Sequence, residues 1–339
     1  MKKLNLNIIS LMLLQLCLIP LLFSCGGDAS SNNAKIWRPP SEKLCQQIMS
    51  NSLSVNDVDL SNQQEVDIQQ MLEMVSPAHG YQLFLKDKKD FMAWITEQKH
   101  TVEVAIHETN HQIDALAPTC SESQYARYFL NGQFHITSIF GSETENYSII
   151  EQILPEYLKA RSVYKIYIAQ NQTNSSKNFT ILLDELTAYV GDSQFQIDFL
   201  NSGLISDQDN YFVMGNIDID EVVDMMLYLE YYLKVVRLDY SASYTAINEP
   251  ATVKVIQYLW QQAEETLHKA YPYIVELDDE LKTHNSGSPF FTGFGDYLPT
   301  LEILKAVYSD DALLELDQLG IAHETLNDWQ DTYLTYEQQ

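Results

Sequence analysis

Two histidines and a glutamate in the stretch VAIHETNHQIDAL, residues 104–116, have the types and spacing of a metal site. His107 and His111 are four residues apart, so on a helix their Cβ atoms would lie about 5 to 6 Å apart on one face. A neutral imidazole nitrogen from each could bind one Zn²⁺ ion. Glu108 need not bind the metal, and could take a proton from the water that the metal activates and pass it to a departing amine.

The residues around these three favour a half-buried helix with one polar edge. Positions 104–106, 109, 110, 112 and 113 are uncharged, and no proline interrupts the run. The alternative is a chance pair of histidines, exposed on a helix or hydrogen-bonded in a core, because the pattern fixes only three residue types.

A zinc site of this kind needs a third protein ligand from elsewhere in the chain. Position 117 is an alanine, so the metzincin pattern with a third histidine six residues after the second is absent. The segment LLDELTAYVGD supplies Glu185, some 74 residues after His111, and the small residue Ala188 follows three positions later.

These two segments, between residues 104 and 190, resemble those of the gluzincin metallopeptidases, in which a glutamate on a later helix completes the HExxH site. The resemblance implies a zincin-like catalytic half in which His107, His111 and Glu185 hold Zn²⁺ and Glu108 is the general base. The alternative third ligands are Asp184, Glu143, Glu145 and Glu221. Asp114 could orient a ligand histidine, and the candidates for stabilising an oxyanion are Tyr189, His135 and Tyr164.

The first 24 residues have the features of an export signal. Lys2 and Lys3 precede an apolar stretch that ends in Leu-Phe-Ser-Cys at Cys25. This ending resembles the lipobox of bacterial lipoproteins, which implies cleavage before Cys25 and lipidation of that cysteine. An uncleaved anchor and an ordinary signal peptide are the alternatives. Gly26 stands where inner-membrane-retained lipoproteins would have an aspartate, so we expect a lipid-anchored envelope protein, with the outer membrane favoured.

The net charge limits the kinds of partner that we expect the protein to bind, and the cysteines bear on a possible disulfide in an exported compartment. The net charge of −27 argues against nucleic acid, whose phosphates would be repelled, and against a peripheral grip on anionic lipids. The membrane contact is then the lipid anchor alone. Cys45 and Cys120 remain beyond the signal and the lipidation site, and in an exported compartment they could form a disulfide. Two free buried thiols are the alternative.

The remaining patterns predict an α+β fold that is predominantly helical. Asn131-Gly132, between two alternating runs, predicts a hairpin. Further strands are expected at residues 80–87 and 162–169, and helices at 41–52, 62–75, 88–99, 179–190, 218–238, 250–284, 297–308 and 323–336. The predicted organisation is a signal peptide over residues 1–24, a flexible tether over 25–40, a zincin-like catalytic region over 41–200 and a helical region over 201–339.

Together these patterns predict a lipid-anchored zinc-dependent hydrolase, specifically a peptidase acting on peptide or protein substrates. The alternative is a non-enzymatic envelope lipoprotein that binds another envelope component through its helical half. That alternative predicts no metal and no proximity between His111 and Glu185.

Overall fold

A computed structural model gives the structure of the protein and describes residues 72, 74–75, 102–116, 125–161, 163–169, 177–202, 219–284 and 300–329. Several predicted features lie outside these residues: the signal peptide, Cys25, the tether, Cys45, Cys120, the helices at 41–52 and 88–99 and the strand at 80–87. In the part that is described, no helix is long and apolar enough to span a bilayer.

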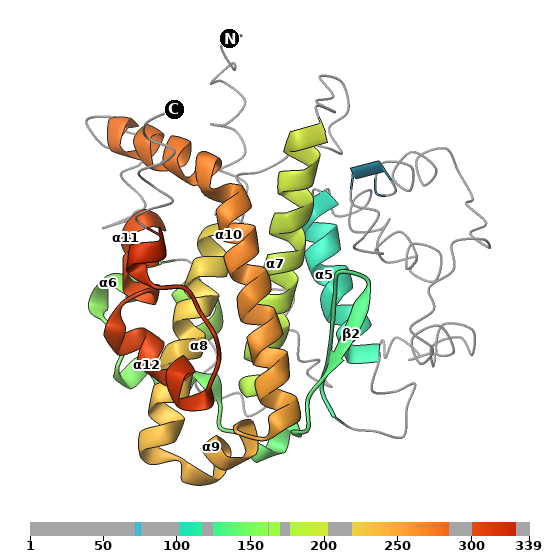
Figure 1. The fold of residues 1–339 in the computed structure, drawn as a ribbon, viewed down its shortest axis with the longest axis vertical. Coiled ribbons are helices and arrows are strands. Elements are labelled where there is room, and N and C mark those ends of the chain that lie inside the picture. The colour runs from blue at the N-terminus through green and yellow to red at the C-terminus, as the bar shows by residue number, and fades with distance from the viewer. Residues whose placement is uncertain are drawn as a thin grey trace, which may run out of the picture.

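The described chain is mostly helical, and its four longest helices pack against one another (Figure 1). Helix α5 packs mainly on α7, and α7 also contacts α8 and α10. The bounds of these helices are α5 Val102–Leu116, α7 Phe179–Ser202, α8 Ile219–Asp239 and α10 Pro250–His284. The predictions for residues 104–116, 218–238 and 250–284 are therefore confirmed to within two residues.

Shorter elements surround this bundle. Helices α11 and α12 cover one side of α8, and α9 packs at its end (Figure 1). Helix α11 lies within the range predicted for it, whereas α9 and α12 were expected only as part of a generally helical half. The bounds are η4 Gly141–Glu143, η5 Tyr147–Gln152, α6 Glu156–Lys159, η6 Tyr164–Ala169, α9 Ser241–Ile247, α11 Thr300–Val307 and α12 Asp310–Leu319.

The hydrophobic core lies mainly between α7, α8 and α10, and it fixes the helix on which the third candidate ligand stands. Aromatic side chains fill it, because each removes a large apolar area from water. Fully buried members include Tyr128, Tyr147, Tyr228, Tyr232, Trp260 and Trp329. The tyrosines of α8 therefore belong to the packing between helices, as aromatic residues on helices usually do.

The predicted hairpin is confirmed. Strand β1 (Arg127–Leu130) pairs antiparallel with β2 (Gln133–Ile136), and together they form the one sheet found in the described residues. Asn131 and Gly132 both have positive φ angles, 51° and 72°, as the tight turn of a two-residue hairpin requires. Helices together with this small sheet agree with the α+β prediction.

The strand predicted at residues 162–169 is wrong. Residues Tyr164–Ala169 form a single π-helical turn, η6. The run of apolar residues is short, and a run of this length does not distinguish a strand from a buried helical segment. Packing against η5 and α6 decides the outcome: Val163, Tyr164 and Ile168 are buried on one side, while Lys165 and Ile166 are exposed.

The helix predicted at residues 179–190 is correct but too short, because α7 continues for three more turns through Gly191. A glycine inside a helix costs about 1 kcal/mol relative to alanine. Burial of Phe195, Ile197 and Phe199 on the continuing helix outweighs that cost, since each buried side chain contributes about 1.5 to 3 kcal/mol. The extension matters for the site, because it carries Asp192 back towards α5.

Candidate metal centre

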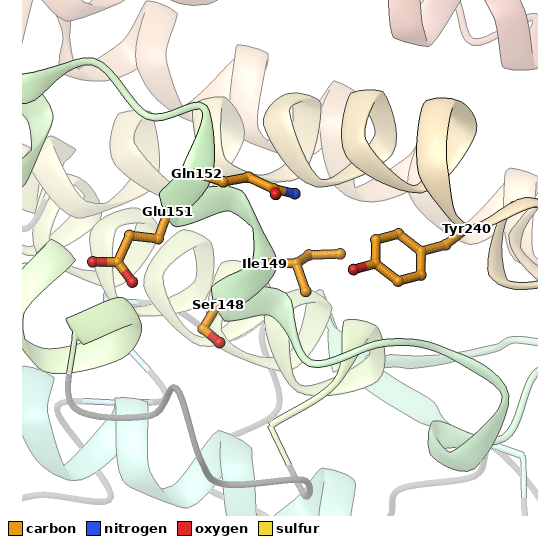
Figure 2. Close-up of a pocket in the computed structure, with 5 residues that line it drawn as sticks. All are labelled: Ser148, Ile149, Glu151, Gln152 and Tyr240. Carbon is orange, nitrogen blue, oxygen red and sulfur yellow. The ribbon is translucent and has the colours of Figure 1, made fainter.

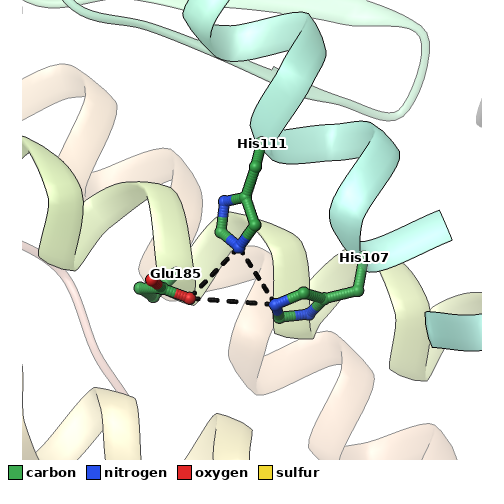
Figure 3. A group of neighbouring side chains, drawn as sticks. All are labelled: His107, His111 and Glu185. Carbon is green, nitrogen blue, oxygen red and sulfur yellow. Dashed lines mark hydrogen bonds and ion pairs between the residues drawn. The ribbon is translucent and has the colours of Figure 1, made fainter. Parts of the chain in front are cut away.

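Helices α5 and α7 bring His107, His111 and Glu185 together (Figure 3). The two histidines stand one turn apart on α5 and point towards α7. On other faces of the helix, the side chains of Ala105, Ile106 and Ile113 are buried. On α7 the buried Ala188 lies one turn beyond Glu185. All three candidate ligands are buried, with exposed fractions of 8% for each histidine and 2% for Glu185.

The atoms of these side chains that face one another have the separations of a metal site. The Nε2 atoms of His107 and His111 lie 3.0 Å apart. Oε2 of Glu185 lies 3.2 Å from Nε2 of His111 and 3.8 Å from Nε2 of His107. Bond lengths of about 2.0 to 2.2 Å in a tetrahedral site would separate ligand atoms by about 3.4 Å. The group is therefore positioned to bind a metal ion.

The other ring nitrogen of each histidine is held by a carboxylate on α7. Nδ1 of His107 donates to Asp192 at 2.9 Å, and Nδ1 of His111 donates to Asp184 at 2.8 Å. Because the Nδ1 atoms carry the donated protons, a neutral imidazole has only a lone pair left on Nε2. Two such lone pairs 3.0 Å apart repel each other unless a proton or a cation lies between them.

The third ligand atom also fits a cation. Oε2 of Glu185 is buried and has no hydrogen-bond partner. A buried carboxylate oxygen in that condition is costly unless a positive charge compensates it. The donor set of two imidazole nitrogens and one carboxylate oxygen is one that a zinc ion accepts.

The charges around the site favour a positive centre. Burial lowers the pKa of His107, but its hydrogen bond with Asp192 and the nearby carboxylate of Glu185 outweigh burial and raise the pKa to about 9. Burial also lowers the pKa of His111, but the charges of Asp184 and Glu185 outweigh burial and raise this pKa well above its usual value. Burial acts to raise the pKa of Glu185, yet the two histidines lower it overall.

Two tyrosines line the same group. The hydroxyl of Tyr167, on η6, lies 2.8 Å from the hydroxyl of Tyr189. The ring of Tyr189 packs edge-on against His107, with ring centres 4.5 Å apart. Burial, followed by the charge of Glu185, raises the pKa of Tyr167 well above its usual value, so this phenol keeps its proton.

Glu108 follows His107 on α5 and does not belong to the group of three candidate ligands. Its side chain is half-buried, one residue after His107, and within the described residues no hydrogen bond or ion pair holds its carboxylate. A carboxylate in that position is available to exchange protons with a neighbouring molecule.

The other sequence candidates have different partners. Among the described residues, no hydrogen bond joins Asp114 to a histidine: its Oδ1 accepts from the backbone N–H of Phe129 at 2.7 Å and so ties β1 to α5. Asp184 lies at the site but holds His111 through Nδ1, and the remaining alternative ligands, Glu143, Glu145 and Glu221, are not in the group. Of the oxyanion candidates, only Tyr189 contacts the site, because His135 stacks on Tyr258 and the Tyr164 hydroxyl donates to Glu151.

Two residues of the site were not predicted from the sequence. Asp192 lies beyond the predicted end of its helix, and Tyr167 lies in the segment predicted as a strand. A signal for the first exists: Phe195 and Phe199 continue the helical spacing past Gly191. No comparable pattern in the sequence indicates Tyr167.

An open hollow of about 360 Å³ lies elsewhere, between η5 and the end of α8 (Figure 2). Ser148, Ile149, Glu151, Gln152 and Tyr240 line it, and none of them belongs to the histidine and glutamate group.

The geometry of the chain itself is the basis for inferring its function. Comparison with protein-family models, with curated proteins and with solved structures finds no match.

Proposed function

We propose that this chain is a zinc-dependent hydrolase, specifically a peptidase. His107, His111 and Glu185 would hold the ion, and Glu108 would act as the general base. The single observation that carries the proposal is the convergence of three buried ligand atoms from two helices, with each histidine held by a carboxylate on the side away from the centre.

Each residue then has a distinct part in peptide hydrolysis. When bound, Zn²⁺ polarises a carbonyl and makes water more acidic. Glu108 takes a proton from the water whose oxygen attacks the carbonyl carbon, and it delivers that proton to the nitrogen as the C–N bond breaks. Asp184 and Asp192 keep the two imidazoles in the tautomer that turns Nε2 to the centre.

Metal analysis of the purified full chain tests the site. We expect about one zinc per chain, lost in His107→Ala, His111→Ala and Glu185→Gln. His268→Ala is the matched control, because His268 also pairs with a carboxylate, Glu324, but is not in the group. Zinc that stays stoichiometric in all three site variants would sink the assignment.

A second variant separates metal binding from catalysis. Glu108→Gln should keep its zinc and lose hydrolysis of an unspecific peptide mixture, since the amide cannot accept the proton. Normal turnover by this variant would remove Glu108 from the reaction. A zinc-loaded wild-type protein without hydrolysis would leave a metal-binding protein and contradict the peptidase proposal.

We also infer that the enzyme works in the cell envelope, held by a lipid on Cys25. The export signal and the lipobox-like ending in the sequence support this location. Labelling with a radioactive fatty acid should mark the wild-type chain and not Cys25→Ser. Membrane fractionation of the same pair would then show whether the lipid is the anchor.

A further inference from the structure

The imidazole of His107 is held in two ways by side chains of α7. Its Nδ1 donates to Asp192 at 2.9 Å. The ring of Tyr189, three residues before Asp192 on the same helix, packs against the imidazole with ring centres 4.5 Å apart and an angle of 61° between the ring planes. Two rings at such a separation and angle attract each other. His107 therefore has a hydrogen bond at one atom and a ring contact beside it.

The hydrogen bond alone does not fix the plane of the imidazole. The torsion that turns a histidine ring has broad energy minima, so the ring can tilt while Nδ1 stays within reach of its partner. A tilt moves Nε2, the atom that lies 3.0 Å from Nε2 of His111 and 3.8 Å from Oε2 of Glu185. A contact that limits the tilt therefore determines where Nε2 of His107 would meet a metal ion.

Tyr189 is itself held at its hydroxyl end. This hydroxyl lies 2.8 Å from the hydroxyl of Tyr167, which stands on η6, a single π-helical turn of the kind that occurs frequently at functional sites. The same turn is tied to η5, because the hydroxyl of Tyr164 donates to Glu151 at 2.7 Å. The phenol ring is thus fixed at both ends, by its backbone on α7 and by its hydroxyl at η6.

We propose that Tyr189 is a positioning residue for the metal centre: its ring, anchored to η6 through the hydroxyl of Tyr167, fixes the plane of His107. The inference rests on the proposed metal site. Asp192 sets the tautomer of the imidazole, and Tyr189 sets its tilt. This role differs from that of an oxyanion stabiliser, because it needs the ring of Tyr189 and not a proton donated to the substrate.

Zinc affinity, measured by competition with a chelator, tests this role without any substrate. Tyr189→Leu removes the ring and should weaken zinc binding about 10- to 100-fold, the usual effect of losing a group that orients a metal ligand. Tyr189→Phe keeps the ring and loses only its anchor, so its loss should be smaller. Tyr258→Leu is the matched control: Tyr258 stacks on His135, which is not in the metal group, so this variant should bind zinc as the wild type does.

A double variant tests the anchor. The two hydroxyls form one contact, so removing either of them breaks it. Tyr189→Phe should therefore weaken zinc binding when Tyr167 is present and have almost no further effect in Tyr167→Phe. Thermal unfolding of the metal-free variants checks that each one folds.

The visible spectrum of the cobalt-loaded protein distinguishes a misplaced ligand from a general loss of packing. Cobalt(II) absorbs visible light with a wavelength and intensity that depend on the arrangement of its ligands. At saturating cobalt, Tyr189→Leu should change this spectrum. Tyr189→Phe should resemble the wild type more closely, and Tyr258→Leu should match it.

The outcomes separate the role of Tyr189 from the metal site itself. Wild-type protein that binds neither zinc nor cobalt overturns both proposals. Wild-type protein that binds zinc, with unchanged affinity and an unchanged cobalt spectrum in Tyr189→Leu, overturns the role of Tyr189 alone. Tyr189→Phe as weak as Tyr189→Leu would assign the effect to the hydroxyl, and additive losses in the double variant would remove the anchor; either result also overturns the proposed role.

Discussion

The Nε2 atoms of His107 and His111 face each other at 3.0 Å, while both Nδ1 atoms donate to carboxylates of the neighbouring helix. When both imidazoles are neutral, the arrangement leaves two lone pairs directed at one place, next to an oxygen of Glu185 that has no hydrogen bond. A core histidine pair would be expected to satisfy its nitrogens with donors and acceptors. Here the two Nε2 atoms and the Glu185 oxygen face one another, which is the arrangement that a bound cation stabilises.

The two aspartates behind the histidines should control metal affinity. Asp192→Asn and Asp184→Asn each keep an oxygen that can accept from Nδ1 but remove the negative charge, so we expect zinc binding to weaken about tenfold or more in each. Titration with a chelator of known affinity measures the change. Asp198→Asn, which removes a carboxylate further along α7, should leave the affinity unchanged. An equal loss in that control would attribute the effect to net charge.

Metal-free protein should lose stability as the pH rises from about 6.5 to about 9. The pKa of His107 is raised from 6.5 to about 9, so protonation of this residue stabilises the fold fully below 6.5, and the contribution is lost as the pH rises through 9. It amounts to about 3 kcal/mol. Urea unfolding in excess chelator across this range measures the loss relative to His107→Gln, which lacks the titrating group. A difference between the two that does not change with pH would contradict the prediction.

Residue spacing in the sequence was sufficient to predict the parts of the site and of the fold that local backbone geometry determines. The four-residue spacing of His107 and His111 fixes their shared face wherever the helix packs, and Asn131-Gly132 demands a tight turn in any context. Glu185 followed from its setting in a helical segment. These residues carry the observation on which the metal site rests.

The rest depended on packing that the sequence does not display. Gly191 is an ordinary end to a helix by propensity, and only the burial of the residues beyond it keeps α7 going to Asp192. Tyr167 lies beside Tyr189 on a π-helical turn, and a run of eight residues rich in apolar side chains does not distinguish that turn from a strand. Asp114 was a reasonable partner for a histidine by spacing, but the adjacent strand takes its oxygen.

The hairpin turn provides a test of the fold beside the site. Asn131 has a φ angle of 51°, and its amide donates to the side chains of Gln262 and Tyr258 on α10. Asn131→Ala should therefore destabilise the protein by about 1 to 3 kcal/mol, through backbone strain and the lost hydrogen bonds. Asn131→Gly keeps the backbone conformation and loses only the side chain, so it should cost less. Equal losses in thermal or urea unfolding would show that the positive φ angle contributes little.

In the helical half, one buried carboxyl group has no hydrogen bond to offset the cost of its burial. Glu230 on α8 is 2% exposed, and neither of its carboxyl oxygens has a hydrogen-bond partner. Burial, followed by the charges of Glu315 and Glu264, raises its pKa well above the usual value. The folded protein therefore keeps Glu230 protonated at pH values where the unfolded chain has released that proton.

Glu230→Gln should stabilise the protein, increasingly so as the pH rises. Below about pH 4.5 the acid is protonated in both states, and the variant and the wild type should be similar in stability. Above it the folded state binds more protons than the unfolded state, so wild-type stability falls by about 1.4 kcal/mol per pH unit until the folded pKa is reached, and glutamine avoids this loss. Urea unfolding of both proteins from pH 4 to 8 measures the gap. Glu156→Gln, at an exposed ion pair with Lys159, should show almost no gap at any pH, since surface pairs contribute little. A Glu230→Gln protein that is no more stable than the wild type at pH 8 would mean that the carboxyl group finds a partner in solution.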